Sequence, residues 1–206
     1  KPLIVREIEK VNYSGKIYDV DVPNDIILVR RGNSSIAVWS GNSNGKFGKA
    51  LRFDGVDDYV EVDDSESLRV DKYVTMCAWT YGKNLEAGWN SVMKKGDDYA
   101  IYIKNNAFDV VTRGTGHAVA GYQVSYNFEN NRWYFLTAII NTEELKIYYY
   151  VNGELIGTKD LPSDYGLISQ TTTPFRVGYP RVDTLYFNGT IDEVRIYNRA
   201  LSEEEI

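Results

Sequence analysis

The sequence predicts an all-β protein, a two-sheet antiparallel jelly-roll sandwich with a small N-terminal β extension. Three observations support this prediction. Short apolar or alternating runs recur at close spacing, and turn-rich segments such as DDSES and KKGDD separate them. The chain holds 17 Tyr, 4 Trp and 7 Phe but 5 Pro and 2 Met, a composition that favours strands. A helix signal occurs only near the C-terminal end.

Eight segments carry the strand signal, in chain order 50–55, 58–62, 74–81, 99–113, 133–140, 144–160, 175–179 and 190–197. The run WYFLTAII (133–140) is apolar on both faces, which is typical of a central, covered strand. We therefore place Trp79 and Trp133 in the core. Asn152-Gly153 predicts a tight hairpin turn within 144–160. In NRALSEEEI, Ser202 and Glu205 have the spacing of a capping box.

Residues 1–43 read as a separate β extension, and residues 44–206 as the main domain. The segments KIYDVDV and DIILVRR alternate around Pro23-Asn24-Asp25, and SSIAVWS follows them. The polar, glycine-rich stretch SGNSNGKFG (40–48) is predicted to be a linker. Because the sequence begins with Lys1, we expect a piece of a larger parent protein.

Composition argues against several partners. The net charge of −6 and the pI near 4.9, without a basic stripe, argue against a nucleic-acid partner. No run approaches the ~20 apolar residues that span a bilayer, so membrane insertion is not expected. Cys77 is the only cysteine, and its apolar surroundings predict a buried structural thiol.

Four blocks together resemble a known family. GKFGKALRFDGVDDYVEV, the strand with Trp79, NRWYFLTAII…YYYVNGELIGT and GTIDEVRIYNRALSEEEI follow one another in the order of the laminin-G-like, concanavalin A-like lectin/glucanase jelly roll. The resemblance covers about residues 44–206. It implies two curved antiparallel sheets and a binding module for glycans or proteins in secreted or surface proteins, in some members with a structural calcium ion.

A second, weaker resemblance concerns residues 11–43, which are similar to the closing strands of Hint (intein-type) domains. Asn42-Ser43 matches the junction of those domains, but Gly41 stands where they carry His, and the half with the nucleophile is absent. Splicing needs that His to polarise the peptide. We therefore expect a structural extension.

The resemblance also implies a calcium site between the first and last strands of the jelly roll. Its ligands would be Asp54, the Gly55 carbonyl, Asp57 and Asp192, since calcium takes six to eight oxygens from carboxylates and carbonyls. In the alternative, Asp54 and Asp57 bond the backbone of a turn, and Asp192 is solvated or bonded to amides. Glu193 is expected to pair with a nearby cation, Arg195 or Arg52.

Aromatic rings and amides in predicted loops suggest a ligand site, because flat apolar rings match the C–H faces of sugars. The candidates come from the loops 84–90 and 116–131 and from GYPRVDTLYF, and they are Trp89, His117, Tyr122, Tyr126, Tyr179 and Arg181. The alternative is that the tyrosines fill cross-strand positions. Trp89 is the strongest candidate, since it lies among Gly and Asn.

Catalysis has weak support. Glu61, Asp63 and Glu66 in EVDDSE match a β-glucanase string, but the string runs from a strand end into a turn, so the three acids should not align. His117 is the only histidine. The leading hypothesis is a non-catalytic binding or adhesion module of a surface, secreted or virion-like protein that recognises carbohydrate or a protein partner. A structural spacer is the second hypothesis and a glycosidase the third; an open groove at Trp89 would favour binding.

Overall fold

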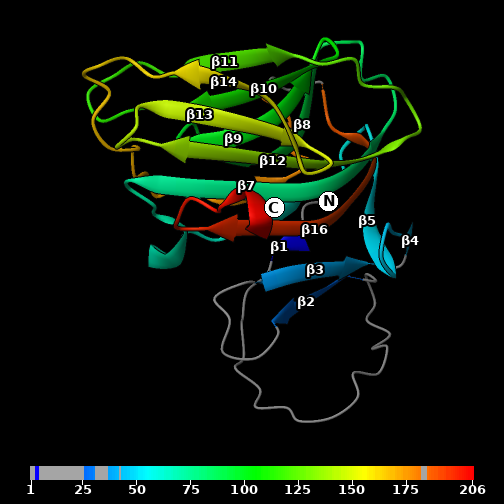
Figure 1. Ribbon diagram of the computed structural model, residues 1–206. Coiled ribbons are helices and arrows are strands. Elements are labelled where there is room, and N and C mark those ends of the chain that lie inside the picture. The colour runs from blue at the N-terminus through cyan, green and yellow to red at the C-terminus, as the bar shows by residue number, and fades with distance from the viewer. Residues whose placement is uncertain (1–2, 5–25, 31–36, 42, 182–184) are drawn as a thin grey trace.

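The computed structural model describes residues 3–4, 26–30, 37–41, 43–181 and 185–206, and it is a sandwich of two seven-stranded sheets (Figure 1). The first sheet has the order β1 (Leu3–Ile4), β6 (Val60–Val62), β15 (Phe175–Val177), β8 (Trp89–Lys95), β9 (Tyr99–Lys104), β10 (Ala107–Thr112), β11 (Ala120–Ser125). The second has the order β14 (Glu154–Asp160), β13 (Lys146–Val151), β12 (Trp133–Asn141), β7 (Tyr73–Gly82), β16 (Asn188–Tyr197), β5 (Lys49–Asp54), β4 (Ser43–Asn44). All pairings are antiparallel except that of β1 with β6, so the predicted jelly roll is confirmed.

The core lies between the two sheets and is built by alternation along each strand. On β7, Val74, Met76 and Ala78 point inward and are fully buried. Trp79 and its neighbour across the strands, Phe135, are half-buried on the outer face, as is Trp133. The prediction that Trp79 and Trp133 belong to the core is therefore wrong. Both faces of β7 are apolar, so alternation alone did not reveal which face is inside.

Several turns form as the sequence indicates. Asn152 and Gly153 have φ values of 55° and 82° and join β13 to β14. Ser202 and Glu205 form the predicted capping box on a single turn, η2 (Glu203–Glu205). The other short helix, η1 (Glu66–Leu68), follows β6. Within the described ranges, neither helix has the length of a membrane span.

Three segments differ from their predictions. The run 99–113 is a hairpin of β9 and β10, with Asn105 and Asn106 at φ values of 47° and 64° in the turn. The loop 84–90 ends in β8, which begins at Trp89, and the loop 116–131 contains β11. Asn tolerates the left-handed conformation, so the Asn-Asn pair was the signal for the missed turn.

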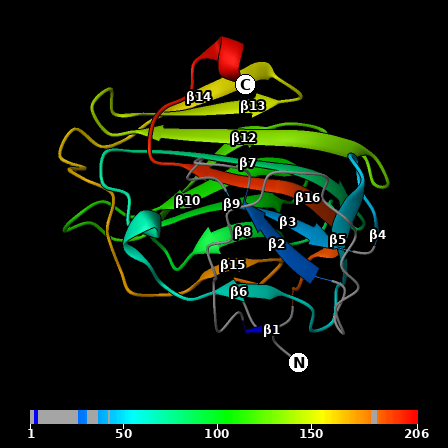
Figure 2. The same cartoon turned by 90° about the horizontal axis from the view of Figure 1, so that it is seen from below.

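The N-terminal region contributes β2 (Ile26–Arg30) and β3 (Ala37–Gly41), which pair antiparallel. Strand β3 lies beside β16 and β5 (Figure 1 and Figure 2). KIYDVDV and Asn42 lie outside the described residues. The linker prediction for 40–48 is wrong in part, because this stretch includes the end of β3 and the whole of β4, which pairs with β5. The division at residue 43 stays a prediction.

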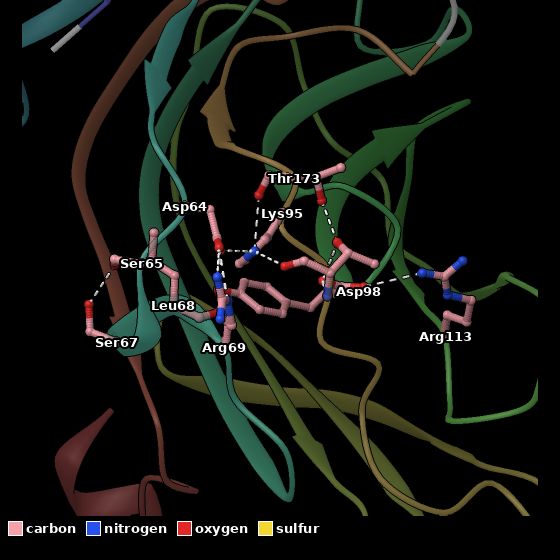
Figure 3. Close-up of polar contacts among 11 residues, drawn as sticks. Asp64, Ser65, Ser67, Leu68, Arg69, Lys95, Asp98, Arg113 and Thr173 are labelled. Atoms are coloured by element: carbon pink, nitrogen blue, oxygen red, sulfur yellow. Dashed lines mark hydrogen bonds and ion pairs between the residues drawn. The ribbon is translucent and has the colours of Figure 1, made fainter. Parts of the chain in front are cut away.

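A buried cation joins three segments at one end of the sandwich (Figure 3). Lys95 is fully buried, and its Nζ donates to Asp64 Oδ1 at 2.7 Å and to the carbonyls of Thr171 and Thr173 at 2.7 and 3.0 Å. Three donors thus meet three acceptors, which is the complete capacity of an ammonium group. Arg69 also contacts Asp64, and the hydrogen bonds from Arg69 and Lys95 lower the pKa of Asp64 to about 2.

The neighbouring Asp98, 1% exposed, completes this polar cluster. Its Oδ2 accepts from the amide and hydroxyl of Thr171 at 2.8 and 2.7 Å, and Arg113 approaches its Oδ1. The Asp98 amide closes the β8–β9 turn by donating to the carbonyl of Lys95 at 2.9 Å. The cluster therefore fixes the β8–β9 hairpin against the 169–174 segment and the loop after β6.

The first prediction concerns Lys95. We expect Lys95→Ala to lower the free energy of unfolding by about 3–5 kcal/mol, because it removes one partner of a buried ion pair and leaves two carbonyls without a donor. Urea unfolding followed by tryptophan fluorescence measures this loss. Lys72→Ala, which breaks an exposed pair with Glu143, is the control and should change the stability far less, because solvent screens that pair. Similar losses for the two variants would contradict the structural role assigned to the buried ammonium group of Lys95.

Candidate functional site

The outer face of the first sheet carries a row of polar side chains across four strands. Ser91 on β8 lies opposite Tyr102 on β9, Tyr102 lies opposite Asp109 on β10, and Asp109 lies opposite Gln123 on β11. Side chains at directly opposite positions have Cβ atoms about 4.5–5.5 Å apart. Tyr102 belongs to a small cluster with Ala100 and Val111 that is separate from the main core. The row thus lies outside the sandwich, on rigid strands.

Most of this row is buried without hydrogen-bond partners. Among the described residues, five buried side-chain atoms have no partner, and four of them belong to this face: Ser91 Oγ, Tyr102 OH, Asp109 Oδ2 and Arg181 Nη1. Ser91, Tyr102 and Asp109 are at most 1% exposed. An unpartnered buried polar group costs about 1–3 kcal/mol. Such a concentration of cost in one place is typical of a binding site.

Trp89 and two cations cover the row, so its polar side chains do not line an open groove at Trp89. The Trp89 ring packs edge-to-face on Tyr102, with centroids 5.2 Å apart. The Nζ of Lys104 lies 3.8 Å from the Trp89 ring centroid, and the guanidinium carbon of Arg181 lies 4.7 Å from it. Burial raises the pKa of Tyr102, and the nearby Arg181 opposes this shift although their atoms do not meet hydrogen-bond geometry.

Further cations extend this face toward β15. Lys94 is 8% exposed, and burial, together with Arg176 and Arg181, lowers its pKa. Arg176 donates to Glu61 at 2.6 Å and lies 4.4 Å from the ring centroid of Tyr179. In a chain with a net charge of −6, four cations on one face (Lys94, Lys104, Arg176 and Arg181) favour an anionic ligand.

Asp109 is the carboxyl group in the row. Its burial raises its pKa to about 6, while Lys104 and Arg181 act in the opposite direction. Near neutral pH the group therefore changes between a hydrogen-bond donor and a pure acceptor. A hydroxyl-rich ligand can satisfy either form.

The structure brings three of the predicted ligand residues to this face and separates the other three. Trp89 and Arg181 lie over the row, and Tyr179 lies beside Lys94 and Arg176 toward β15. Burial also raises the pKa of Tyr122, whose ring packs on the main core from β11; its carbonyl accepts from Tyr149. Tyr126 packs against Phe128 and Tyr134. Of the six candidates, three therefore lie at this face and three lie elsewhere, and the ligand role of each stays a prediction.

His117 also lies apart from this row. Its Nε2 is 2.7 Å from the carbonyl oxygen of Asp164, and its ring stacks on Tyr165. This arrangement fixes the loop before β11 to the 162–166 segment. The alternative stated for Tyr122 and Tyr126, that tyrosines act as packing residues, agrees with their placement.

The predicted calcium ligands are not brought together either. Asp54, Asp57 and Asp58 form an exposed group whose carboxylate oxygens lie within 4.8 Å of one another, and Asp192 is not part of it. Asp54 lies opposite Asn188, four residues before Asp192 on β16, which is about 13 Å along a strand. Asp54 Oδ1 accepts from the amides of Val56 and Asp57, as expected of a turn.

Asp192 itself is 2% exposed and bonded to amides. Its Oδ2 accepts from the amide of Phe47 at 3.1 Å, and its Oδ1 accepts from the amide of Glu193 at 2.8 Å. Burial raises its pKa, and these amides oppose the shift. Because amide hydrogens point at both oxygens, the structure agrees with the alternative in which Asp192 is bonded to amides, and its role as a calcium ligand stays a prediction. Glu193 pairs with Arg195, as predicted.

The acids of the glucanase-like string do not converge. Glu61 is on β6 and pairs with Arg176, whereas Glu66 lies in η1, beyond the end of the strand. Cys77 is buried beneath Thr137, and burial raises its pKa to about 11, so it is a structural thiol as predicted.

Comparisons with known proteins agree with this architecture. Residues 54–206 match the family model described as the concanavalin A-like lectin/glucanases superfamily, and the chain belongs to this family. No curated protein sequence matches the chain. Similar solved structures share the fold at low sequence identity.

One is the CBM40 of a Ruminococcus gnavus sialidase bound to α2,3-sialyllactose, at a TM-score of 0.59 and 17% identity, covering 76% of this chain and 92% of that one. Another is the ligand-binding domain of botulinum neurotoxin serotype D in complex with N-acetylneuraminic acid, at 0.64 and 15%, covering 88% and 49%. A third is the binding domain of Paraclostridial Mosquitocidal Protein 1, at 0.57 and 19%, covering 90% and 45%. The chain thus spans about half of each toxin domain.

The raised pKa of Asp109 gives a pH-dependent prediction. Its folded pKa of about 6 exceeds the unfolded value of about 3.8, so the folded state binds more protons in this window and loses stability as pH rises through it. Asp109→Asn removes this loss. The variant should gain up to about 3 kcal/mol relative to the wild type between pH 4 and pH 7, since one pKa unit is about 1.36 kcal/mol.

Urea unfolding at pH 4, 5, 6 and 7 measures this difference. Asp63→Asn, at an exposed position, controls for the loss of a carboxylate. A difference between Asp109→Asn and the wild type that stays constant with pH would contradict the assigned burial of the charge.

Asp192 gives a prediction that separates an amide clamp from a metal ligand. Asp192→Ala should lower the free energy of unfolding by about 3 kcal/mol, because charge-assisted hydrogen bonds to amides are lost. The loss should be equal in calcium and in chelator, as measured by urea unfolding. Asp63→Ala, at an exposed position outside the predicted calcium site, is the control. If calcium stabilises the wild type but not Asp192→Ala, then Asp192 is a ligand.

Proposed function

We propose that this protein is a non-catalytic carbohydrate-binding module that recognises a glycan with an acidic group through the outer face of the first sheet. The observation that carries the proposal is the row of Ser91, Tyr102 and Asp109, buried without partners beneath Trp89 and Arg181. On a purely structural surface, nothing would offset the free-energy cost of burying these unpartnered groups. A ligand rich in hydroxyl groups supplies the missing donors and acceptors.

The parts of the site have complementary roles. Arg181 and Lys104 attract a carboxylate, and Arg181 offers a planar fork for a bidentate contact. The Trp89 ring packs on the C–H face of a sugar. Since Trp89 and Arg181 cover the row, the ligand enters when the Arg181 side chain turns outward. The guanidinium then pairs with the ligand's acid, and the sugar hydroxyls reach Ser91, Tyr102 and Asp109.

Two of the similar structures hold ligands of this chemistry, sialyllactose and N-acetylneuraminic acid, which are acidic sugars. Their low identity to this chain makes them support for the ligand class and not for individual contacts. Retaining glycoside hydrolysis needs two carboxylates about 5–5.5 Å apart. In the described part of the row, Asp109 is the single carboxylate, which favours binding without catalysis. A secreted or cell-surface parent fits this role.

A glycan array probed with the purified chain tests the proposal. We expect binding to glycans that end in acidic sugars and little binding to their neutral counterparts. Arg181→Ala should weaken binding to the best glycan at least tenfold by calorimetry, whereas Arg52→Ala, at an exposed position on the other sheet, should leave it unchanged. Repeating the array with calcium and with chelator tests the predicted calcium dependence separately.

A blank array with folded protein would overturn the proposal and favour the structural spacer. Binding to neutral glycans alone would also contradict it, because Arg181 and Lys104 would then have no role in recognition.

A further inference from the structure

A hollow lies on the outer face of the second sheet. It has a volume of about 350 Å³, within the range of small-molecule sites of about 300–1,000 Å³. Its walls come from strands β7 and β12, the β13–β14 turn, the loop after β4 and the C-terminal residue Ile206. The lining residues used below are Lys46, Trp79, Arg132, Trp133, Phe135 and Asn152. These residues take no part in the row on the first sheet.

The floor of this hollow is aromatic. Trp79 lies directly opposite Phe135, with ring centroids 5.3 Å apart and planes tilted by 34°. Trp133 lies two residues before Phe135 on the same face and packs on Tyr81 at 5.5 Å. Half-buried aromatic rings on neighbouring strands form a firm apolar platform. Such a platform suits the C–H face of a pyranose ring.

Asp192 does not line the hollow, but it holds the loop that carries one wall. It lies opposite Trp79, beside a β-bulge at which Glu193 has a φ of 50°, and its carboxylate holds the amide of Phe47. Gly45 allows this approach, because a Cβ there would lie 2.5 Å from Asp192 Oδ2. The clamp places Lys46 Nζ 4.8 Å from the Trp79 ring centroid and Phe47 edge-on to the same ring.

The rim of the hollow carries groups that can bind the polar substituents of a ligand. Lys46 is exposed, and its Nζ lies over the Trp79 ring. None of the ion pairs among the described residues includes Lys46, so its charge is available to a ligand. Asn152 Oδ1 accepts from the amide of Phe135 at 2.9 Å, which leaves the Asn152 NH₂ as a donor. Arg132 pairs with Glu129 at 3.2 Å, and both side chains are exposed. The rim therefore carries one cation outside any ion pair of the described residues, Lys46, and one hydrogen-bond donor, the Asn152 NH₂.

From this geometry we infer a second carbohydrate site, which takes a pyranoside with a carboxylate. The ring packs on Trp79 and Phe135, the carboxylate pairs with Lys46, and a hydroxyl accepts from Asn152. Asp192 is a positioning residue, since it acts through the backbone that carries Lys46. This inference rests on its own residues and stands whether or not the face around Trp89 binds a glycan.

Titration with methyl β-D-glucuronide, followed by ¹H–¹⁵N NMR, tests this inference on the full chain. The indole N–H signals separate the two faces, because Trp89 reports on the first sheet and Trp79 and Trp133 report on the second. We expect millimolar glucuronide to shift the signals of Trp79 and Trp133. Methyl β-D-glucoside should bind at least fivefold more weakly, because it lacks the charge.

Two exposed lysines provide matched variants. Lys46→Glu should weaken glucuronide binding at least tenfold, whereas Lys49→Glu, three residues away and outside the hollow, should leave it unchanged. If neither the Trp79 nor the Trp133 signal moves in the folded protein, or if Lys46→Glu binds as the wild type does, the inference is overturned. A shift confined to Trp89 would overturn it and leave the proposed function intact.

Discussion

The need to satisfy every polar group taken into the sandwich governs this structure. Lys95 shows the requirement in its strictest form, since a fully buried ammonium group donates to one carboxylate and two carbonyls from segments far apart in the chain. Asp98 and Asp192 are likewise buried and supplied with donors. These three residues decide where the loops at the ends of the sheets lie. The polar contacts thereby fix the positions of these loops. The apolar core does not determine them, because burial of apolar surface has no direction.

Against this background, the outer row on the first sheet is the exception. The hairpin that Lys95 and Asp98 fix at its turn also carries Ser91 and Tyr102, and there the donors and acceptors lack partners in the described structure. Burying these groups without partners costs free energy, and Lys95, Asp98 and Asp192 avoid the same cost through their hydrogen bonds. Local rules fail most often where a protein binds something, and the same face gathers the cations of an otherwise acidic chain.

The sequence predicted a local turn and a helix cap correctly, but it did not predict which face of a strand lies inside the sandwich. The Asn152-Gly153 turn and the Ser202–Glu205 capping box depend on neighbouring residues, so a short window contains their cause. The placement of Trp79 depends on which side of β7 meets the other sheet, and both sides are apolar. The row of Ser91, Tyr102 and Asp109 depends on strand register. Successive members of the row lie 11 and 7 positions apart in the sequence, so no short motif spans them. Asp109 carried one local signal, a carboxylate within an apolar strand.

The adjacent acids of the last strand illustrate how register turns composition into structure. In a regular strand, Asp192 and Glu193 would point to opposite faces, and one of them would enter the core. The bulge between Asp192 and Arg195, with Glu193 in the left-handed region, removes this conflict. Glu193 then pairs with Arg195, and Asp192 is free to hold the loop that carries Lys46. A local irregularity in the final strand thus fixes a segment more than 140 residues earlier. That segment lies next to the aromatic floor of the hollow on the second sheet.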